Sequence, residues 1–126
     1  MKAQASCAPA LRGDRDLSAP LAAWLRTQGF TAQEEAQPGM ATMAAHWINL
    51  QLDRFELAYV WQRAPAGHAV ATCRLQVLYA HEWDFTTLFT AQRVHRLRDV
   101  RALLLGNVRY ANARQVALAT GALQPA

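Results

Sequence analysis

Apolar and polar residues alternate with a period of two through the middle of this chain. Alternate side chains on a strand point to opposite faces of a sheet, so the alternation predicts strands that each bury one face. The expected strands cover about residues 42–52, 54–62, 68–80 and 85–94. Because short turns separate consecutive strands, the sequence predicts a four-stranded antiparallel meander.

The same alternation predicts which side chains face the core. In the first strand His46 and Ile48 lie on the predicted core side, which places Trp47 on the polar side. Asp53-Arg54 is the predicted hairpin turn between the first two strands. The predicted core sets of the later strands are Phe55, Leu57, Tyr59 and Trp61, then Ala71, Cys73, Leu75, Val77 and Tyr79, then Phe85, Thr87, Phe89 and Ala91.

Helical patterns stand at both ends of the strand region. A proline in the first turn and a glycine after the last turn predict a helix over about 19–28. An apolar stripe at helical spacing predicts a second helix over about 96–105, and Asn112 is the predicted cap of a last short helix over about 113–120. Residues 31–41 are polar and contain Pro-Gly, which predicts a flexible loop.

This order of elements predicts an α+β fold. We expect an N-terminal helix, a four-stranded antiparallel meander and a C-terminal helix or helix pair packed on one face of the sheet. Strands and helices do not alternate, which excludes a doubly wound parallel sheet. The expected organisation is a flexible N-terminal arm over 1–17, a single domain over 18–121 and a C-terminal tail over 122–126.

Composition limits the class of protein. Apolar residues make up 52% of the chain and charged residues 17%, which argues against intrinsic disorder. No apolar run reaches the roughly 18–20 residues that a membrane span needs, and the first residues lack the apolar segment of a secretory signal. Cys7 and Cys73 are too few and too far apart for a disulfide framework. We therefore expect a cytoplasmic protein with reduced thiols, with Cys73 buried in its strand and without membrane contact.

Positive charge gathers toward the end of the chain. Residues 91–126 contain six arginines and a single acid, Asp99. Guanidinium groups bind phosphates, so the candidates for an anion-binding or nucleic-acid-binding site are Arg93, His95, Arg96, Arg98, Arg101 and Arg109. The start of a helix disfavours cations, and no recognition-helix or RNA-binding motif is present. A solvated basic face is the alternative interpretation.

One predicted turn concentrates groups that can do chemistry. His81-Glu82-Trp83-Asp84 combines an imidazole with carboxylates, and His46 could join them, which is the donor set of a metal-dependent hydrolase. Neighbouring side chains on an extended chain point to opposite faces, which disfavours a shared ion. The chain has no G-x-S-x-G motif and no glycine-rich phosphate loop, so we expect no catalytic residue, no bound metal and no cofactor.

Aromatic residues support the leading hypothesis. Trp47, Tyr59 and Trp61 are the candidates for an exposed contact surface, because aromatic side chains are enriched in protein interfaces. We expect a small non-enzymatic interaction module whose partner is a second copy of itself or another protein. Nucleic-acid binding and metal-dependent hydrolysis are the alternatives.

Overall fold

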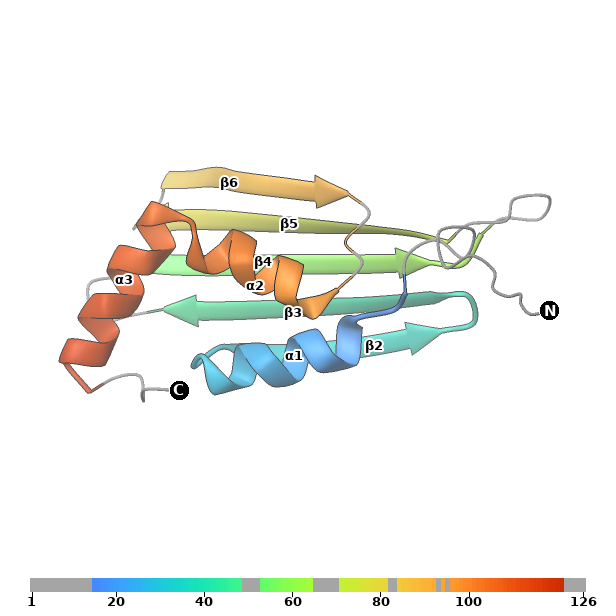
Figure 1. Cartoon of the computed structure of the whole chain (residues 1–126), viewed down its shortest axis with the longest axis horizontal. Helices are drawn as coiled ribbons and strands as arrows, with labels where there is room; N and C mark the ends of the chain where they lie inside the picture. Colours follow the sequence, from blue (N-terminus) through green and yellow to red (C-terminus); the bar gives the residue numbers. More distant parts are fainter. Residues whose placement is uncertain are drawn as a thin grey trace.

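A computed structural model of the chain describes residues 15–48, 53–64, 71–81, 84–92, 94 and 96–121. The elements run in the order α1 (Ser18–Thr27), β2 (Thr31–Gln37), β3 (Met40–Ile48), β4 (Asp53–Gln62), β5 (Thr72–His81), β6 (Asp84–Gln92), α2 (Leu97–Leu105) and α3 (Val108–Ala119). Figure 1 shows the three helices on one side of a single sheet. The predicted α+β class is confirmed. Residues 1–14 and 122–126, which hold most of the predicted arm and the predicted tail, lie outside the described residues.

The sheet has five strands, each antiparallel to the one before it, in the order β2-β3-β4-β5-β6. The meander is thus as predicted, but it has one more strand, because residues 31–37 pair with β3 instead of forming a loop. Ala32 is the one fully buried residue of β2, so the strand lacks the alternation that would reveal it. Pro38 and Gly39 form the turn, and Gly39 has the positive φ of 77° that favours glycine there.

The predicted inward face of the first long strand is wrong. Trp47 is buried, whereas His46 and Ile48 are exposed on the other side of β3. Asp53 and Arg54 also do not form the predicted turn, because both belong to β4. The reason is the pairing of β3 with β4. Trp47 stands opposite Phe55, and paired residues lie on the same face of a sheet. Because Phe55 is buried, Trp47 also faces the core.

The predicted inward faces of β4 and β5 are confirmed, but that of β6 changes along the strand. Phe89 pairs with Val77 and packs against the core, whereas Phe85 pairs with Ala80 and is 54% exposed. A register shift at Val77/Leu78 separates the two pairings. Such an irregularity moves later side chains to the opposite face, which no count of alternating residues anticipates.

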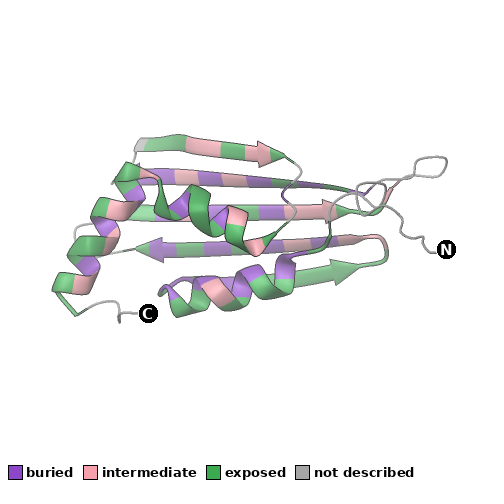
Figure 2. Ribbon diagram, viewed as in Figure 1, coloured by how far each residue is buried: buried purple, intermediate pink, exposed green. Residues whose placement is uncertain are grey.

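The core fills the space between the helices and the inner face of the sheet, as the buried positions in Figure 2 show. The helices bury one stripe each, which consists of Leu21, Ala22 and Leu25 in α1, Val100 and Leu104 in α2, and Tyr110, Ala113 and Ala117 in α3. Tyr110 stands edge-on to Phe55, with ring centroids 5.2 Å apart. None of the helices within the described residues has both the length and the apolar composition that a membrane span requires.

The last helix begins earlier than predicted. Asn107, and not Asn112, caps α3: its side-chain oxygen accepts a hydrogen bond from the backbone N–H of Tyr110 at 3.1 Å. Asn112 is instead an exposed residue inside the helix. The early start has a tertiary cause, because it carries Tyr110 into the aromatic cluster around Phe55.

Tyr59 ties the segment before α1 to the centre of the sheet. Its hydroxyl accepts a hydrogen bond from the backbone N–H of Leu17 at 2.9 Å and donates one to the carbonyl of Arg15 at 3.2 Å. Tyr59 is fully buried and Leu17 nearly so. A residue predicted to form a contact surface therefore has a structural role within the monomer.

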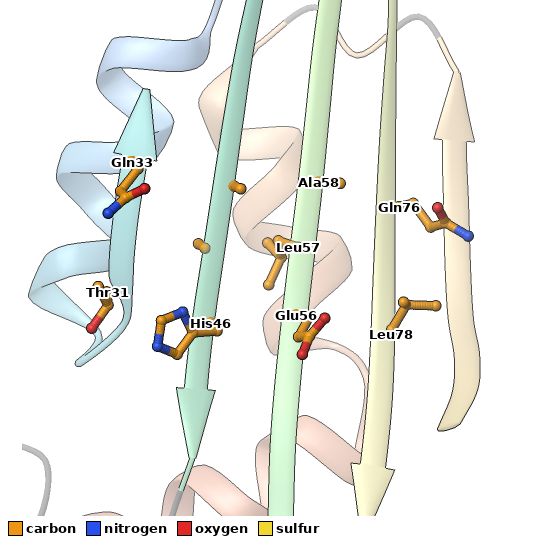
Figure 3. Close-up of a pocket in the computed structure, with 10 residues that line it drawn as sticks. Thr31, Gln33, His46, Glu56, Leu57, Ala58, Gln76 and Leu78 are labelled. Atoms are coloured by element: carbon orange, nitrogen blue, oxygen red, sulfur yellow. The ribbon is translucent and has the colours of Figure 1, made fainter. Parts of the chain in front are cut away.

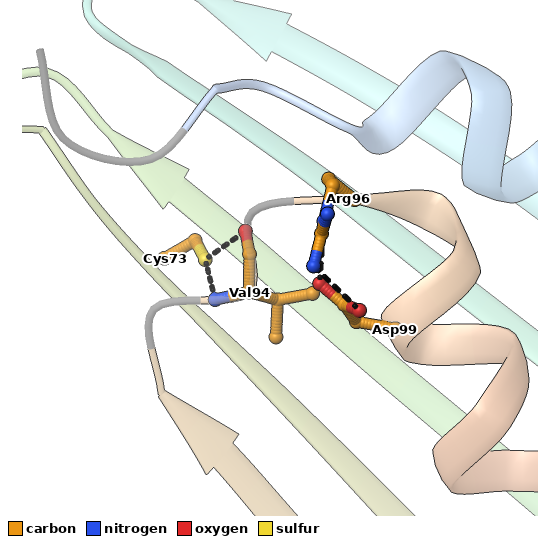
Figure 4. A network of polar contacts seen from close by, with 4 residues as sticks. All are labelled: Cys73, Val94, Arg96 and Asp99. Carbon is orange, nitrogen blue, oxygen red and sulfur yellow. Dashed lines mark hydrogen bonds and ion pairs between the residues drawn. The ribbon is translucent and has the colours of Figure 1, made fainter. Parts of the chain in front are cut away.

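Cys73 joins β5 to the segment that follows β6. As predicted, its thiol is buried. Its sulfur accepts a hydrogen bond from the N–H of Val94 at 3.0 Å, and the thiol donates to the Val94 carbonyl at 3.3 Å (Figure 4). This contact fixes the chain just before it enters α2.

Candidate functional site

The side of the sheet opposite the helices, which we call the outer face, is the candidate site. Its central row runs across four strands through Gln33, Ala44, Ala58 and Gln76, which are successive register partners. Ala44 and Ala58 are exposed, so no part of the described chain covers the middle of this face. Because methyl groups stand here between larger side chains, the face is hollowed at its centre.

This depression has a volume of about 360 Å³. Figure 3 shows the side chains around it, with the helices behind the sheet. Its rim is formed by Thr31, Gln33, His46, Glu56, Gln76 and Leu78. The depression is broad and open, and its floor is the sheet itself, so it fits a surface that lies against the sheet better than it fits an enclosed small molecule.

Charges of both signs flank the central row. His46 and Glu56 are register partners on one side of it. On the other side, Glu35 on β2 and Arg74 on β5 lie in one row, which continues to Gln92 on β6. Within the described parts of the chain, neither Glu35 nor Arg74 forms a salt bridge. The outer face therefore holds an exposed acid and an exposed base on opposite sides of a neutral centre.

One end of the outer face is apolar. Ile48 is 51% exposed there, and Phe85 lies on the same side of the sheet. The guanidinium carbon of Arg54 lies 5.9 Å from the centre of the Phe85 ring. Arg54 and Phe85 are both register partners of Ala80, so their contact passes over that residue. Ala80 is therefore buried although it points away from the helices.

A second cluster lies on the inner side, where β4 and β5 meet α3. Asp53 accepts a hydrogen bond from the hydroxyl of Tyr79 at 2.5 Å, and the Nδ1 atom of His81 lies 3.2 Å from the same oxygen. The guanidinium of Arg109 lies 4.5 Å from the Tyr79 ring centre. Burial, and then the hydrogen bond and charge of Asp53, raise the pKa of Tyr79, and Arg109 opposes this. A cavity of about 520 Å³ adjoins the cluster and is also lined by Asn112.

This cluster does not reproduce the predicted metal site. His81 turns to Asp53, while His46 lies on the opposite face of the sheet, so the two imidazoles do not converge. Glu82 and the side chain of Asp84 lie outside the described residues. In the described part of the chain, no group of three or more histidine, cysteine or acidic side chains could hold a metal ion. The contacts that are present tie the sheet to α3.

The predicted anion-binding residues have different surroundings. Arg96 forms a salt bridge with Asp99 at 3.2 Å, drawn in Figure 4. The guanidinium of Arg101 lies 5.5 Å from the Trp24 ring centre. Arg98 is exposed, whereas Arg109 lies against Tyr79 as described above. Arg93 and His95 lie outside the described residues. Intramolecular partners thus engage three of the four described arginines in this set.

The predicted aromatic contact surface is largely absent from the exterior. Trp47 and Tyr59 are buried in the monomer core, and Trp61 is half-buried and packs against that core. Sequence reasoning missed Ala44 and Ala58 because alanine gives no signal on either face of a strand. Their place opposite each other on the outer face follows only from the register of β3 against β4.

No protein-family model, no curated protein and no solved structure matches this chain.

Proposed function

We propose that this protein is a non-enzymatic, cytoplasmic interaction module that self-associates through its outer face. The observation that supports this most directly is the exposed, hollowed alanine centre at Ala44 and Ala58. A face that serves only to keep a domain dissolved usually carries long charged residues at its centre. Here the charged residues stand around the centre instead, which is the arrangement of an interface with a polar rim.

The size of the outer face suits a specific contact. Four strands at about 4.8 Å spacing, each about eight residues long at about 3.3 Å per residue, span roughly 500 Å² in projection. Two such surfaces give roughly 1,000 Å², and side-chain relief adds to the accessible area. A specific interface needs about 1,000 Å² in total, so a dimer formed by this face alone meets that requirement.

Sedimentation equilibrium of the full chain tests this proposal, with Ala58→Arg as the interface variant. An arginine at the centre would fill the depression and carry a charge that the contact must desolvate, so we expect a dimer for the natural chain and a monomer for the variant. Ala23→Arg is the matched control, because Ala23 is an exposed alanine of α1 on the other side of the molecule. A natural chain that stays monomeric at high concentration would falsify the proposal.

Nucleic-acid binding is the alternative function, and the exposed Arg98 at the start of α2 supports it. It has less support than self-association, because Arg96 and Arg101 are engaged with Asp99 and Trp24. The two functions use different surfaces, so Ala58→Arg and a change at Arg98 separate them.

A further inference from the structure

We infer that two copies of the chain pair face to face about a two-fold axis that runs along the strands, between β3 and β4. This inference rests on the proposed self-association and specifies its geometry. It follows from the strand register alone, which fixes where each side chain of the outer face lies relative to the others. The two rows that carry charge decide the position of the axis.

The first charged row crosses the sheet through Thr31, His46, Glu56 and Leu78, on β2, β3, β4 and β5 in turn. The second row runs through Glu35, Thr42, Val60 and Arg74 on the same four strands. In the first row, therefore, a base and an acid occupy the two inner strands. In the second row, an acid and a base occupy β2 and β5, which lie on either side of β3 and β4.

Rotation by 180° about the proposed axis exchanges β3 with β4 and β2 with β5, and leaves each row in place. His46 then faces the partner's Glu56, and Glu35 faces the partner's Arg74. Because a two-fold contact is reciprocal, each of these pairings occurs twice in the dimer. Both charged rows become complementary through a single operation.

The neutral row between them is compatible with the same axis. Ala44 faces the partner's Ala58, and Gln33 faces the partner's Gln76. The alanines leave a space between the two sheets at the centre, which the glutamine side chains beside it can fill while they exchange amide hydrogen bonds. Sheets packed face to face lie about 10 Å apart with strands crossing at about 30°, which an axis about 15° from the strand direction provides.

Neighbouring positions of the axis lose these complementary pairings. An axis along β4 would stack the Arg54–Glu56 ion pair on the same pair of the partner and would set Arg74 against the partner's Thr42. An axis along β3 would set His46 against the partner's His46 and Glu35 against the partner's Val60. Of these three positions, only the axis between β3 and β4 brings Glu35 to the partner's Arg74 and His46 to the partner's Glu56, so charge complementarity favours it.

Charge reversal at the second row tests this geometry. Glu35→Arg alone and Arg74→Glu alone each create two like-charge contacts in a homodimer, so we expect the dissociation constant of each variant to rise at least tenfold. A mixture of the two variants behaves differently: in a heterodimer, both contacts pair opposite charges again. Native mass spectrometry of the mixture should therefore show the heterodimer in clear excess over either homodimer.

Two further proteins complete the experiment. The double variant Glu35→Arg/Arg74→Glu exchanges the charges and should dimerise about as well as the natural chain. Arg98→Glu is the matched control, because it makes the same change at an exposed arginine on α2 and should leave dimerisation unaltered. Far-UV circular dichroism verifies that each variant is folded, as expected for substitutions of exposed side chains.

The outcomes separate this inference from the proposed function. If the natural chain never dimerises, the self-association itself is wrong. If the natural chain dimerises and Ala58→Arg abolishes this, but the mixed variants form heterodimers only in statistical proportion, the outer face is the interface and the axis is wrong. Preferential heterodimers together with the rescued double variant establish the axis between β3 and β4.

Discussion

Removal of one oxygen atom tests how the helical layer is attached to the sheet. Tyr59→Phe keeps the aromatic ring in its place in the core, so it creates no cavity. It deletes the acceptor of the Leu17 N–H and the donor to the Arg15 carbonyl. The Arg15 carbonyl belongs to an exposed residue and can bind water, whereas Leu17 is only 4% exposed. The main cost is therefore one buried N–H without an acceptor.

An unsatisfied buried donor costs about 1–3 kcal/mol, and we take about 1.5 kcal/mol because Leu17 lies at the edge of the core. A domain of about 105 residues unfolds with an entropy of about 0.2 kcal/mol/K, so the melting temperature should fall by about 7 °C. We expect the loss of this hydrogen bond to destabilise the start of α1 first, because Leu17 directly precedes that helix. The Leu17 carbonyl also accepts a hydrogen bond from the Leu21 N–H.

Thermal unfolding followed by circular dichroism measures this change, with Tyr79→Phe as the matched control. The Tyr79 hydroxyl bonds to Asp53, which keeps His81 as a neighbour and is partly open to water, so we expect a loss of about 0.5 kcal/mol in the control. A Tyr59→Phe protein that melts within about 2 °C of the natural chain would show that the Leu17 N–H finds another acceptor, and would refute the reasoning.

Four further predictions concern α3, the first hairpin and the basic helix. Burial raises the pKa of Tyr110 to about 12 from its ordinary 10.0, so the folded chain keeps a proton that the unfolded chain releases. Stability should be unaffected by this group below pH 10 and fall as pH rises toward 12, and urea titrations should show a smaller fall in Tyr110→Phe. Asn107→Ala removes the cap of α3 and should cost about 1 kcal/mol in the same titrations, whereas Asn107→Asp should cost less; equal losses would contradict the capping role. Gly39→Ala forces a side chain into the left-handed region of φ and should lower the free energy of unfolding by about 1 kcal/mol. Ala36→Gly, on the adjoining edge strand β2, is the comparison for a substitution without a positive φ. Fluorescence anisotropy with a labelled duplex should show that Arg98→Glu weakens any low-salt binding; unchanged binding would place that activity elsewhere.

The sequence by itself determined the class of the fold. The inward faces of β4 and β5 were predictable, because large apolar residues such as Leu57 and Val77 alternate there with polar ones and only one face can be buried. Helices α1 and α2 were predictable for the same reason, since each carries one apolar stripe, whereas the start of α3 was predicted too late in the chain. The order of the elements then limited the topology to a meander.

Only the tertiary structure decided that residues 31–37 form a strand and which face of β3 is buried. Strand β2 lies at the edge of the sheet and buries only Ala32, so its side chains show no alternation, and its pairing with β3 is what makes it a strand. Trp47 turns inward because it faces Phe55 on the next strand, which reverses the predicted face of β3.

The outer face belongs to the same category. Glu35 and Arg74 are far apart in sequence, and three successive strand pairings place them in one row. A period of two tells which side of a strand a residue occupies, but not which residue stands beside it on the next strand. The neighbour on the next strand is set by hydrogen bonding between strands and by the packing of the core. Any contact surface of a sheet depends on which residues are neighbours in this way.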